Sequence, residues 1–130
     1  MYKILSLVWF KIYPARFGGQ KGIAEFNEYL SQYYDAIDCL CASENEVSDK
    51  TKVQILPELP NNKWQFLNPL VWNKIYHRFK KGSYTHVVIE FPYYGYIGAL
   101  LKRKGAFYIL HAHNIEGERL KNWRLFLKLR

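Results

Sequence analysis

Two kinds of segment alternate along the chain when its positions are sorted into hydrophobic and polar. Short, continuous apolar runs such as KILSLVWF and THVVIEF are typical of strands that are buried on both faces. Between them, apolar residues recur at the three- and four-residue spacing of an amphipathic helix. The runs predict strands at residues 3–10, 36–42, 53–56, 85–91 and 106–113. The helical spacing predicts helices at 20–34, 69–81 and 96–104, and from about residue 116 onward.

Strands that alternate with helices predict right-handed crossovers and therefore a parallel sheet. With 130 residues, the chain has the length of one domain. Asn68 is placed to cap the helix that starts at Pro69, and Gly82 to end it. The proline-rich stretch 57–69 is expected to be an irregular loop. The predicted fold class is α/β, an open parallel sheet with helices on both faces.

Composition changes this picture in two respects. The formal charge of +8 favours an anionic partner, which could be nucleic acid, a phosphorylated small molecule or an acidic membrane surface. Cys39 and Cys41 are too close for a structural disulfide and do not have zinc-site spacing, so they are expected to be reduced core thiols of a cytoplasmic protein. The basic stretches 78–81 and 102–104 are either solvated helix faces or a peripheral contact with an anionic inner leaflet.

Three polar or glycine-rich segments follow predicted strands: ARFGGQKG, EFPYYGY and HAHNIEGE. Because ligands of parallel sheets bind at the carboxyl ends of the strands, these segments are expected at one rim. Gly18 and Gly19 would let the main chain approach a ligand closely, and the following helix start would offer amide groups to an anion. A plain turn accounts for a double glycine equally well. The spacing is that of neither a dinucleotide-binding motif nor a P-loop.

The segment HAHNIEGERL, residues 111–120, allows several interpretations. His111 and His113 would point to the same side of a strand, but no third or fourth metal ligand is identifiable, so no metal site is expected. Asn114 could cap the last helix, with Glu116 in its first turn. Because His113 leaves the end of a strand at the same rim as the glycines, it is also placed to contact a polar ligand. His77 and His86 are expected to be structural.

The order of these segments resembles the family 4 glycosyltransferases. The sequence Pro14-Ala15-Arg16-Phe17-Gly18-Gly19 after the first strand is similar to the start of that family, and HAHNIEGERLK is similar to its H-N-x-E segment. THVVIEFPYYGYIGALLKRKG resembles the strand and helix that precede this segment. The resemblance implies a Rossmann-like domain, residues 1–130, corresponding to the N-terminal, acceptor-side domain of a GT-B fold.

The resemblance also implies a function: transfer of a sugar, with retention, from a nucleotide-sugar donor to a glycan or lipid-linked acceptor, without a metal or other cofactor. It implies that the main chain at Gly18 and Gly19 approaches the donor, and that His113 lies near the reacting sugar as the catalytic residue. Asn114 and Glu116 belong to the same motif. Arg16 and Lys21 would add positive charge near the leaving phosphate.

The family's C-terminal, donor-binding domain has no counterpart in these residues, so the chain is expected to have no appreciable turnover alone. It would be a fragment, half of a split enzyme, or an inactive remnant that pairs with a second chain. The alternative is a non-catalytic basic module that binds nucleic acid or a partner protein. Nucleic acid is disfavoured because the basic residues are scattered and no nucleic-acid motif is present.

Overall fold

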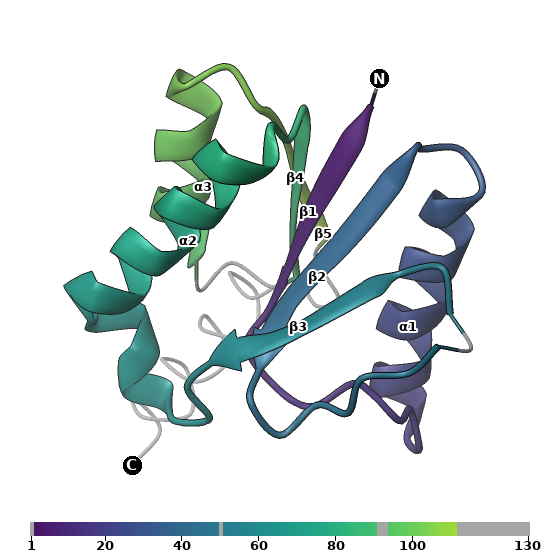
Figure 1. Ribbon diagram of the computed structural model, residues 1–130. Helices are drawn as coiled ribbons and strands as arrows, with labels where there is room; N and C mark the ends of the chain where they lie inside the picture. Colours follow the sequence, from purple (N-terminus) through teal and green to yellow (C-terminus); the bar gives the residue numbers. More distant parts are fainter. Residues whose placement is uncertain (1, 50, 91–93, 112–130) are drawn as a thin grey trace, which may run out of the picture.

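A computed structural model describes residues 2–49, 51–90 and 94–111, and their core is a five-stranded sheet (Figure 1). Every pairing is parallel and the strand order is β3-β2-β1-β4-β5. The strands are β1 (Lys3–Val8), β2 (Ala36–Ala42), β3 (Gln54–Leu59), β4 (His86–Glu90) and β5 (Phe107–His111). This confirms the predicted parallel α/β fold, which is Rossmann-like.

Helices lie on both faces of the sheet, as predicted (Figure 1). The helices are α1 (Gly18–Ser31), α2 (Pro69–Gly82) and α3 (Gly95–Arg103), together with the 3-10 helix η1 (Lys63–Leu67). The side chain of Asn68 accepts a hydrogen bond from the amide of Leu70 at 3.0 Å, so it caps α2 as expected. Helix α1 covers one face, and α2 and α3 cover the other.

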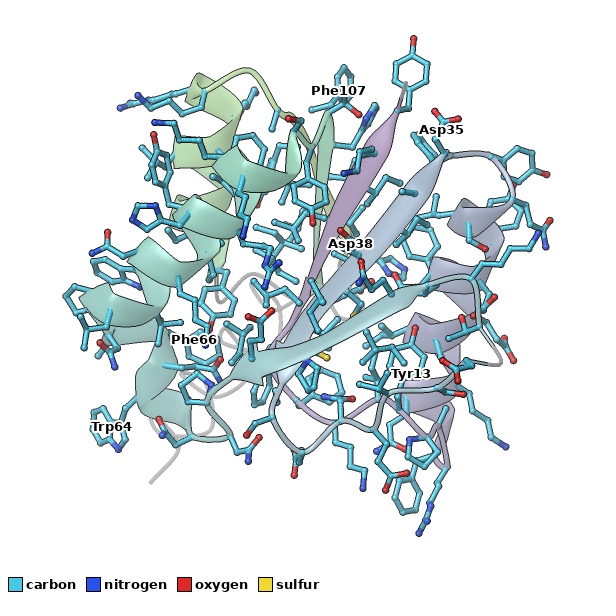
Figure 2. The ribbon with its side chains drawn as sticks, viewed as in Figure 1. Tyr13, Asp35, Asp38, Trp64, Phe66 and Phe107 are labelled. Atoms are coloured by element: carbon cyan, nitrogen blue, oxygen red, sulfur yellow. The ribbon has the colours of Figure 1, made fainter. Side chains whose placement is uncertain are left out.

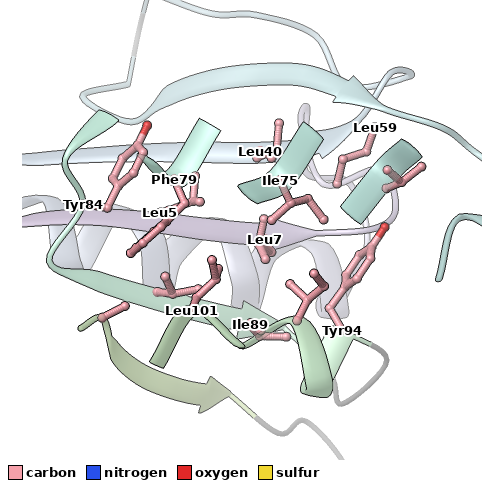
Figure 3. Close-up of a cluster of buried hydrophobic side chains, with 14 residues drawn as sticks. Leu5, Leu7, Leu40, Leu59, Ile75, Phe79, Tyr84, Ile89, Tyr94 and Leu101 are labelled. Carbon is pink, nitrogen blue, oxygen red and sulfur yellow. The ribbon is translucent and has the colours of Figure 1, made fainter. Parts of the chain in front are cut away.

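The face under α2 and α3 is closed by apolar side chains (Figure 3). Because successive strand residues point to opposite faces, Leu5 and Leu7 of β1 project to this side, where they meet Ile75 of α2 and Leu101 of α3. All four are fully buried. The face under α1 is built from the alternate set of strand positions, including the buried thiols Cys39 and Cys41, which form no disulfide, as predicted.

Several predicted boundaries were wrong, and strand β1 ends at Val8 where the apolar run predicted residue 10. Helix α1 begins at Gly18 and ends at Ser31, whereas the spacing predicted 20–34. Strand β3 continues through Pro57 to Leu59, which is possible because β3 lies at the edge of the sheet. The predicted loop 57–69 also contains the 3-10 helix. The last two residues of the expected strand 106–113 and the helix expected from residue 116 lie outside the described residues. Within the described ranges, no helix has the length and hydrophobicity needed to cross a bilayer.

Candidate functional site at the carboxyl edge of the sheet

Strands β1, β4 and β5 end at the same edge of the sheet because they run parallel. Val8 ends β1, Glu90 ends β4 and His111 ends β5, and Glu90 and His111 are direct neighbours in the register. The chain leaves β1 at this edge and enters α1 at Gly18. The carboxyl edge therefore holds the start of α1 and the end of β5, where ligands of open parallel sheets bind.

The segment between β1 and α1 is held in place by the side chain of Asn45, which is buried. Its Oδ1 accepts hydrogen bonds from the amides of Ile12 and Tyr13 at 2.7 and 2.9 Å. Its Nδ2 donates to the carbonyls of Phe10 and Ala42 at 3.1 and 2.8 Å. One buried amide side chain thus fixes the approach to α1, because it bonds to four main-chain groups from two separate segments.

The first turn of α1 contains the double glycine. Gln20 Oε1 accepts hydrogen bonds from the amides of Arg16 and Phe17 at 2.8 and 3.2 Å, which closes the turn before the helix. The glycines were expected in a loop before the helix, but Gly18 and Gly19 are its first two residues. The amides of a first turn have no acceptor within the helix, so those of Gly18 and Gly19 can bind an anion.

Among the residues that the structure describes, neither packing nor backbone conformation requires glycine at these two positions. A Cβ atom added to Gly18 or Gly19 would meet no heavy atom within 4 Å, and neither residue has a positive φ. With respect to the described residues, the space beside both Cα atoms is therefore open. Arg16, just before the helix, and Lys21, in its first turn, are both exposed. The structure thus brings four of the predicted site residues together around one helix start.

Behind this turn, a buried polar cluster joins α1 to the sheet. Ser6 Oγ donates to Asn27 Oδ1 at 3.2 Å, and Asn27 Nδ2 donates to the hydroxyl of Tyr13 at 3.4 Å and to Cys39 Sγ at 3.9 Å. Burial, followed by the charge of Cys39, raises the pKa of Tyr13 well above its ordinary value. Hydrogen bonding with Cys41, followed by burial, raises the pKa of Cys39. The cluster is therefore neutral around pH 7, which suits a structural role.

The end of β5 carries an imidazole paired with a buried carboxylate. Glu90 is 1% exposed, and its Oε2 lies 2.8 Å from Nδ1 of His111. The ring of His111 also packs against Phe26 of α1, with 4.2 Å between the ring centroids. Phe26 lies two turns beyond Gly19, about 10 Å along the helix axis. Helix α1 therefore connects the open glycine turn with the end of β5.

The three remaining predicted site residues, His113, Asn114 and Glu116, lie outside the described residues. Among the residues that the structure describes, no three His, Cys, Asp or Glu side chains form a group that could hold a metal ion. His86 stands at the opposite, amino edge of the sheet, where its Nδ1 is 2.8 Å from the hydroxyl of Thr85. His77 lies on α2, beside Tyr76.

Sequence reasoning missed the polar cluster around Asn27. Two signals in the pattern could have found it. Asn27 interrupts the apolar stripe of α1 between Ile23 and Leu30, and Ser6 stands in the middle of an apolar strand run. A polar residue at a core position needs a polar partner, so each of these residues predicts a buried polar contact, without identifying the other partner.

Comparison with known proteins gives a match to structure only. Neither a family model nor a curated protein matches the chain. A solved structure that does match is sucrose-phosphate synthase from Thermosynechococcus elongatus, with a TM-score of 0.60 and 15% sequence identity. The match covers 87% of this chain but 33% of that protein. The likeness shows the fold and not the activity. The chain spans a third of the matched protein's length.

Proposed function

We propose that this chain is the acceptor-side domain of a retaining glycosyltransferase that transfers a sugar from a nucleotide-sugar to a glycan or lipid-linked acceptor. The observation that carries the proposal is the open first turn of α1, where two glycines stand although neither packing nor φ requires them. The resemblance of residues 14–19 and 111–121 to family 4 glycosyltransferases supports it. So does the fold, which is shared with a protein whose name describes the synthesis of a sugar phosphate.

In this proposal, the amides of Gly18 and Gly19 bind the donor, because first-turn amides and the helix dipole stabilise a phosphate or a sugar oxygen. Arg16 and Lys21 lower the energy of the negative charge that develops on the leaving phosphate. His113 contacts the reacting sugar, and Asn114 and Glu116 hold the segment that carries it. The reaction also needs a second, donor-binding domain, so we expect no appreciable turnover from these 130 residues alone.

Binding of the donor can be tested by NMR with uridine- and guanosine-diphosphate hexoses. We expect these ligands to shift the amide resonances of Gly18 and Gly19 saturably, and to leave Gly105 unchanged, since Gly105 follows α3 at the amino edge. Gly19→Ala should weaken the binding because its methyl group occupies the space beside the amide. Saturable shifts confined to other parts of the chain, or none at all, would contradict the proposal.

Gly22→Ala is the matched control for Gly19→Ala. Gly22 lies on the same helix, and a Cβ atom there also meets no heavy atom within 4 Å. Its amide, however, lies beyond the first turn and is bonded within the helix. We therefore expect Gly22→Ala to bind the nucleotide-sugar like the unmodified chain. Equal weakening by both substitutions would indicate a general effect on α1 and not a contact at Gly19.

A contact with an anionic membrane surface is favoured by the ends of α2 and α3. Their last turns carry Lys80, Lys81, Lys102 and Arg103, and both helices end at the amino edge of the sheet. Each such residue near an anionic bilayer contributes about 1 kcal/mol of binding free energy. Sedimentation with phosphatidylserine vesicles should therefore exceed that with phosphatidylcholine vesicles, and salt should abolish the difference. Equal sedimentation with both kinds of vesicle would indicate that these basic residues are only solvated at the ends of the helices and do not bind the membrane.

A further inference from the structure

A hollow lies at the amino edge of the sheet, on the face that α1 partly covers. Its volume is about 550 Å³, within the range of small-molecule sites. The described residues that line it are Tyr2, Tyr33, Tyr34, His86 and Phe107. They come from the starts of three strands and from the residues that follow α1. The carboxyl edge is one strand length away, about 17 Å for five residues.

The rings in the hollow stand at angles to one another and so form walls. The ring of His86 lies at the centre, 5.8 Å from that of Tyr2, 5.1 Å from that of Tyr34 and 5.4 Å from that of Phe107. The rings of Tyr2 and Tyr34 meet that of His86 edge-on, at 79° and 71°. Rings arranged in this way present flat apolar faces around a shared space, together with hydroxyl groups and an imidazole.

The main chain around the hollow is held firmly in place. The amide of Tyr2 donates to Asp35 Oδ2 at 2.7 Å, and the amide of Asp35 donates to the carbonyl of Tyr2 at 2.9 Å. His86 is held by Thr85, whose hydroxyl also bonds to the main chain of Lys3. These contacts fix the main chain at Tyr2 and position the imidazole of His86 before any ligand arrives, which lowers the entropy cost of binding.

Three of the rings are far more exposed than core aromatics, and Tyr33 among them is 66% exposed. Tyr2 is 62% exposed and Phe107 is 69% exposed, and Figure 2 shows Phe107 at the end of the sheet opposite Tyr13. Large exposed aromatic side chains gathered around a hollow mark a contact site. The described lining residues include no Asp, Glu, Lys or Arg. The lining therefore suits a neutral ligand better than a phosphate or an anionic lipid headgroup.

We infer that this hollow binds a neutral glycan. A sugar ring has apolar C–H faces that stack on aromatic rings, and hydroxyl groups that can bond to the tyrosine hydroxyls and the imidazole of His86. The tyrosines and His86 offer both kinds of contact, whereas a lipid chain would use only the ring faces. The inference extends the proposed function, on which the choice of a glycan rests, because it gives the acceptor a second contact far from the transfer edge.

The inference can be tested by titrating the full chain with neutral gluco-, galacto- and manno-tetrasaccharides while following the ring protons of His86 and Phe107 by NMR. We expect at least one tetrasaccharide to shift both sets saturably. Phe107→Ala should weaken that binding roughly tenfold, the loss expected for one stacked ring, and Phe107→Tyr should retain it. Circular dichroism would verify that both variants fold. If no tetrasaccharide binds, or if binding survives Phe107→Ala, the inference is wrong.

Trp64→Ala is the control for non-specific binding to exposed aromatic side chains, since Trp64 is 75% exposed and lies at the other end of the molecule (Figure 2). It should leave the titration unchanged. An equal loss of glycan binding with Trp64→Ala would overturn the inference. Self-association of the chain that Phe107→Ala abolishes would also overturn it, because it would assign the hollow to a second copy. Binding to phosphatidylcholine that Phe107→Ala abolishes would assign the hollow to lipid, with the same consequence. Gly19→Ala should not change glycan binding, so this test fails separately from the test of donor binding.

Discussion

The two faces of the sheet are covered in different ways. Under α2 and α3 the contacts are mainly apolar, and the buried side chain of Gln65 bonds to the hydroxyl of Tyr94 at the margin of this cluster. Even Gly98 of α3 is closely packed, since a Cβ atom there would lie 2.1 Å from the ring of Tyr108. Under α1, the buried side chains include Ser6 and Asn27, and the helix begins with two glycines at which an added Cβ atom would meet none of the described residues within 4 Å. The first face is built for stability. The second combines stability with groups that can face a ligand, and each prediction below tests that difference.

The largest effect is expected on the apolar face. Ile75 is fully buried between α2 and the sheet, so Ile75→Ala should lower the free energy of unfolding by about 2–5 kcal/mol through lost burial and the cavity that remains. Leu70→Ala, on the same helix but at a site that is 76% exposed, should change it by less than about 0.5 kcal/mol. Urea unfolding measures both. A small effect at Ile75 would mean that α2 is not packed against the sheet.

On the face under α1, called the polar face below, Asn27→Ala should lower the free energy of unfolding by about 1–3 kcal/mol. The substitution leaves the hydroxyls of Ser6 and Tyr13 buried without their partner. Ser6→Ala removes one of these orphaned groups, so the double variant should lose less stability than the sum of the two single variants. Urea unfolding of all three variants gives the coupling energy. Additive losses would show that the hydrogen bond between these side chains contributes nothing.

Alkaline pH should lower the free energy of unfolding through both faces of the sheet, since each face has a buried tyrosine. Burial raises the pKa of Tyr13 under α1 and of Tyr84 on the other face above the ordinary value of 10.0. The folded chain therefore holds these protons after the unfolded chain has released them, so stability is full below pH 10 and falls as the pH rises above it. Thermal unfolding from pH 8 to 11 should show this fall. Tyr13→Phe should make it shallower, and an unchanged slope would contradict the assignment.

The apolar face was the easier one to predict from the sequence. Runs such as residues 85–91 and the helical stripe of residues 69–81 depend on local periodicity, which fixes the element and the side that it buries. The polar face depends on pairs that are distant in sequence, such as Ser6 with Asn27 and Glu90 with His111. A single sequence does not reveal such pairs, because they form only once the strand order is set.

Glycine gives the clearest example of the same difference. The pattern treats Gly18 and Gly82 alike, as turn or helix-boundary residues, and gives no reason for Gly98 inside the helix predicted at 96–104. In the fold, Gly82 and Gly98 leave room for the rings of Tyr84 and Tyr108, whereas Gly18 leaves open space. The reason for a glycine therefore lies in its neighbours across the fold and not in its local sequence. This is why the helix start was predicted two residues late and the site was predicted as a loop.

The smallest effect is expected at the glycine turn itself. Because nothing occupies the space around Gly19 and its φ is not positive, Gly19→Ala should leave the free energy of unfolding within about 0.5 kcal/mol of the unmodified chain. Gly22→Ala, deeper in the helix, should raise it by up to about 1 kcal/mol, the usual advantage of alanine over glycine. Urea unfolding of both variants makes the comparison. Marked destabilisation by Gly19→Ala would mean that the fold itself needs this glycine, and the argument for a ligand at the first turn of α1 would lose its basis. Unchanged stability together with weakened donor binding would leave ligand contact as the reason for glycine at this position.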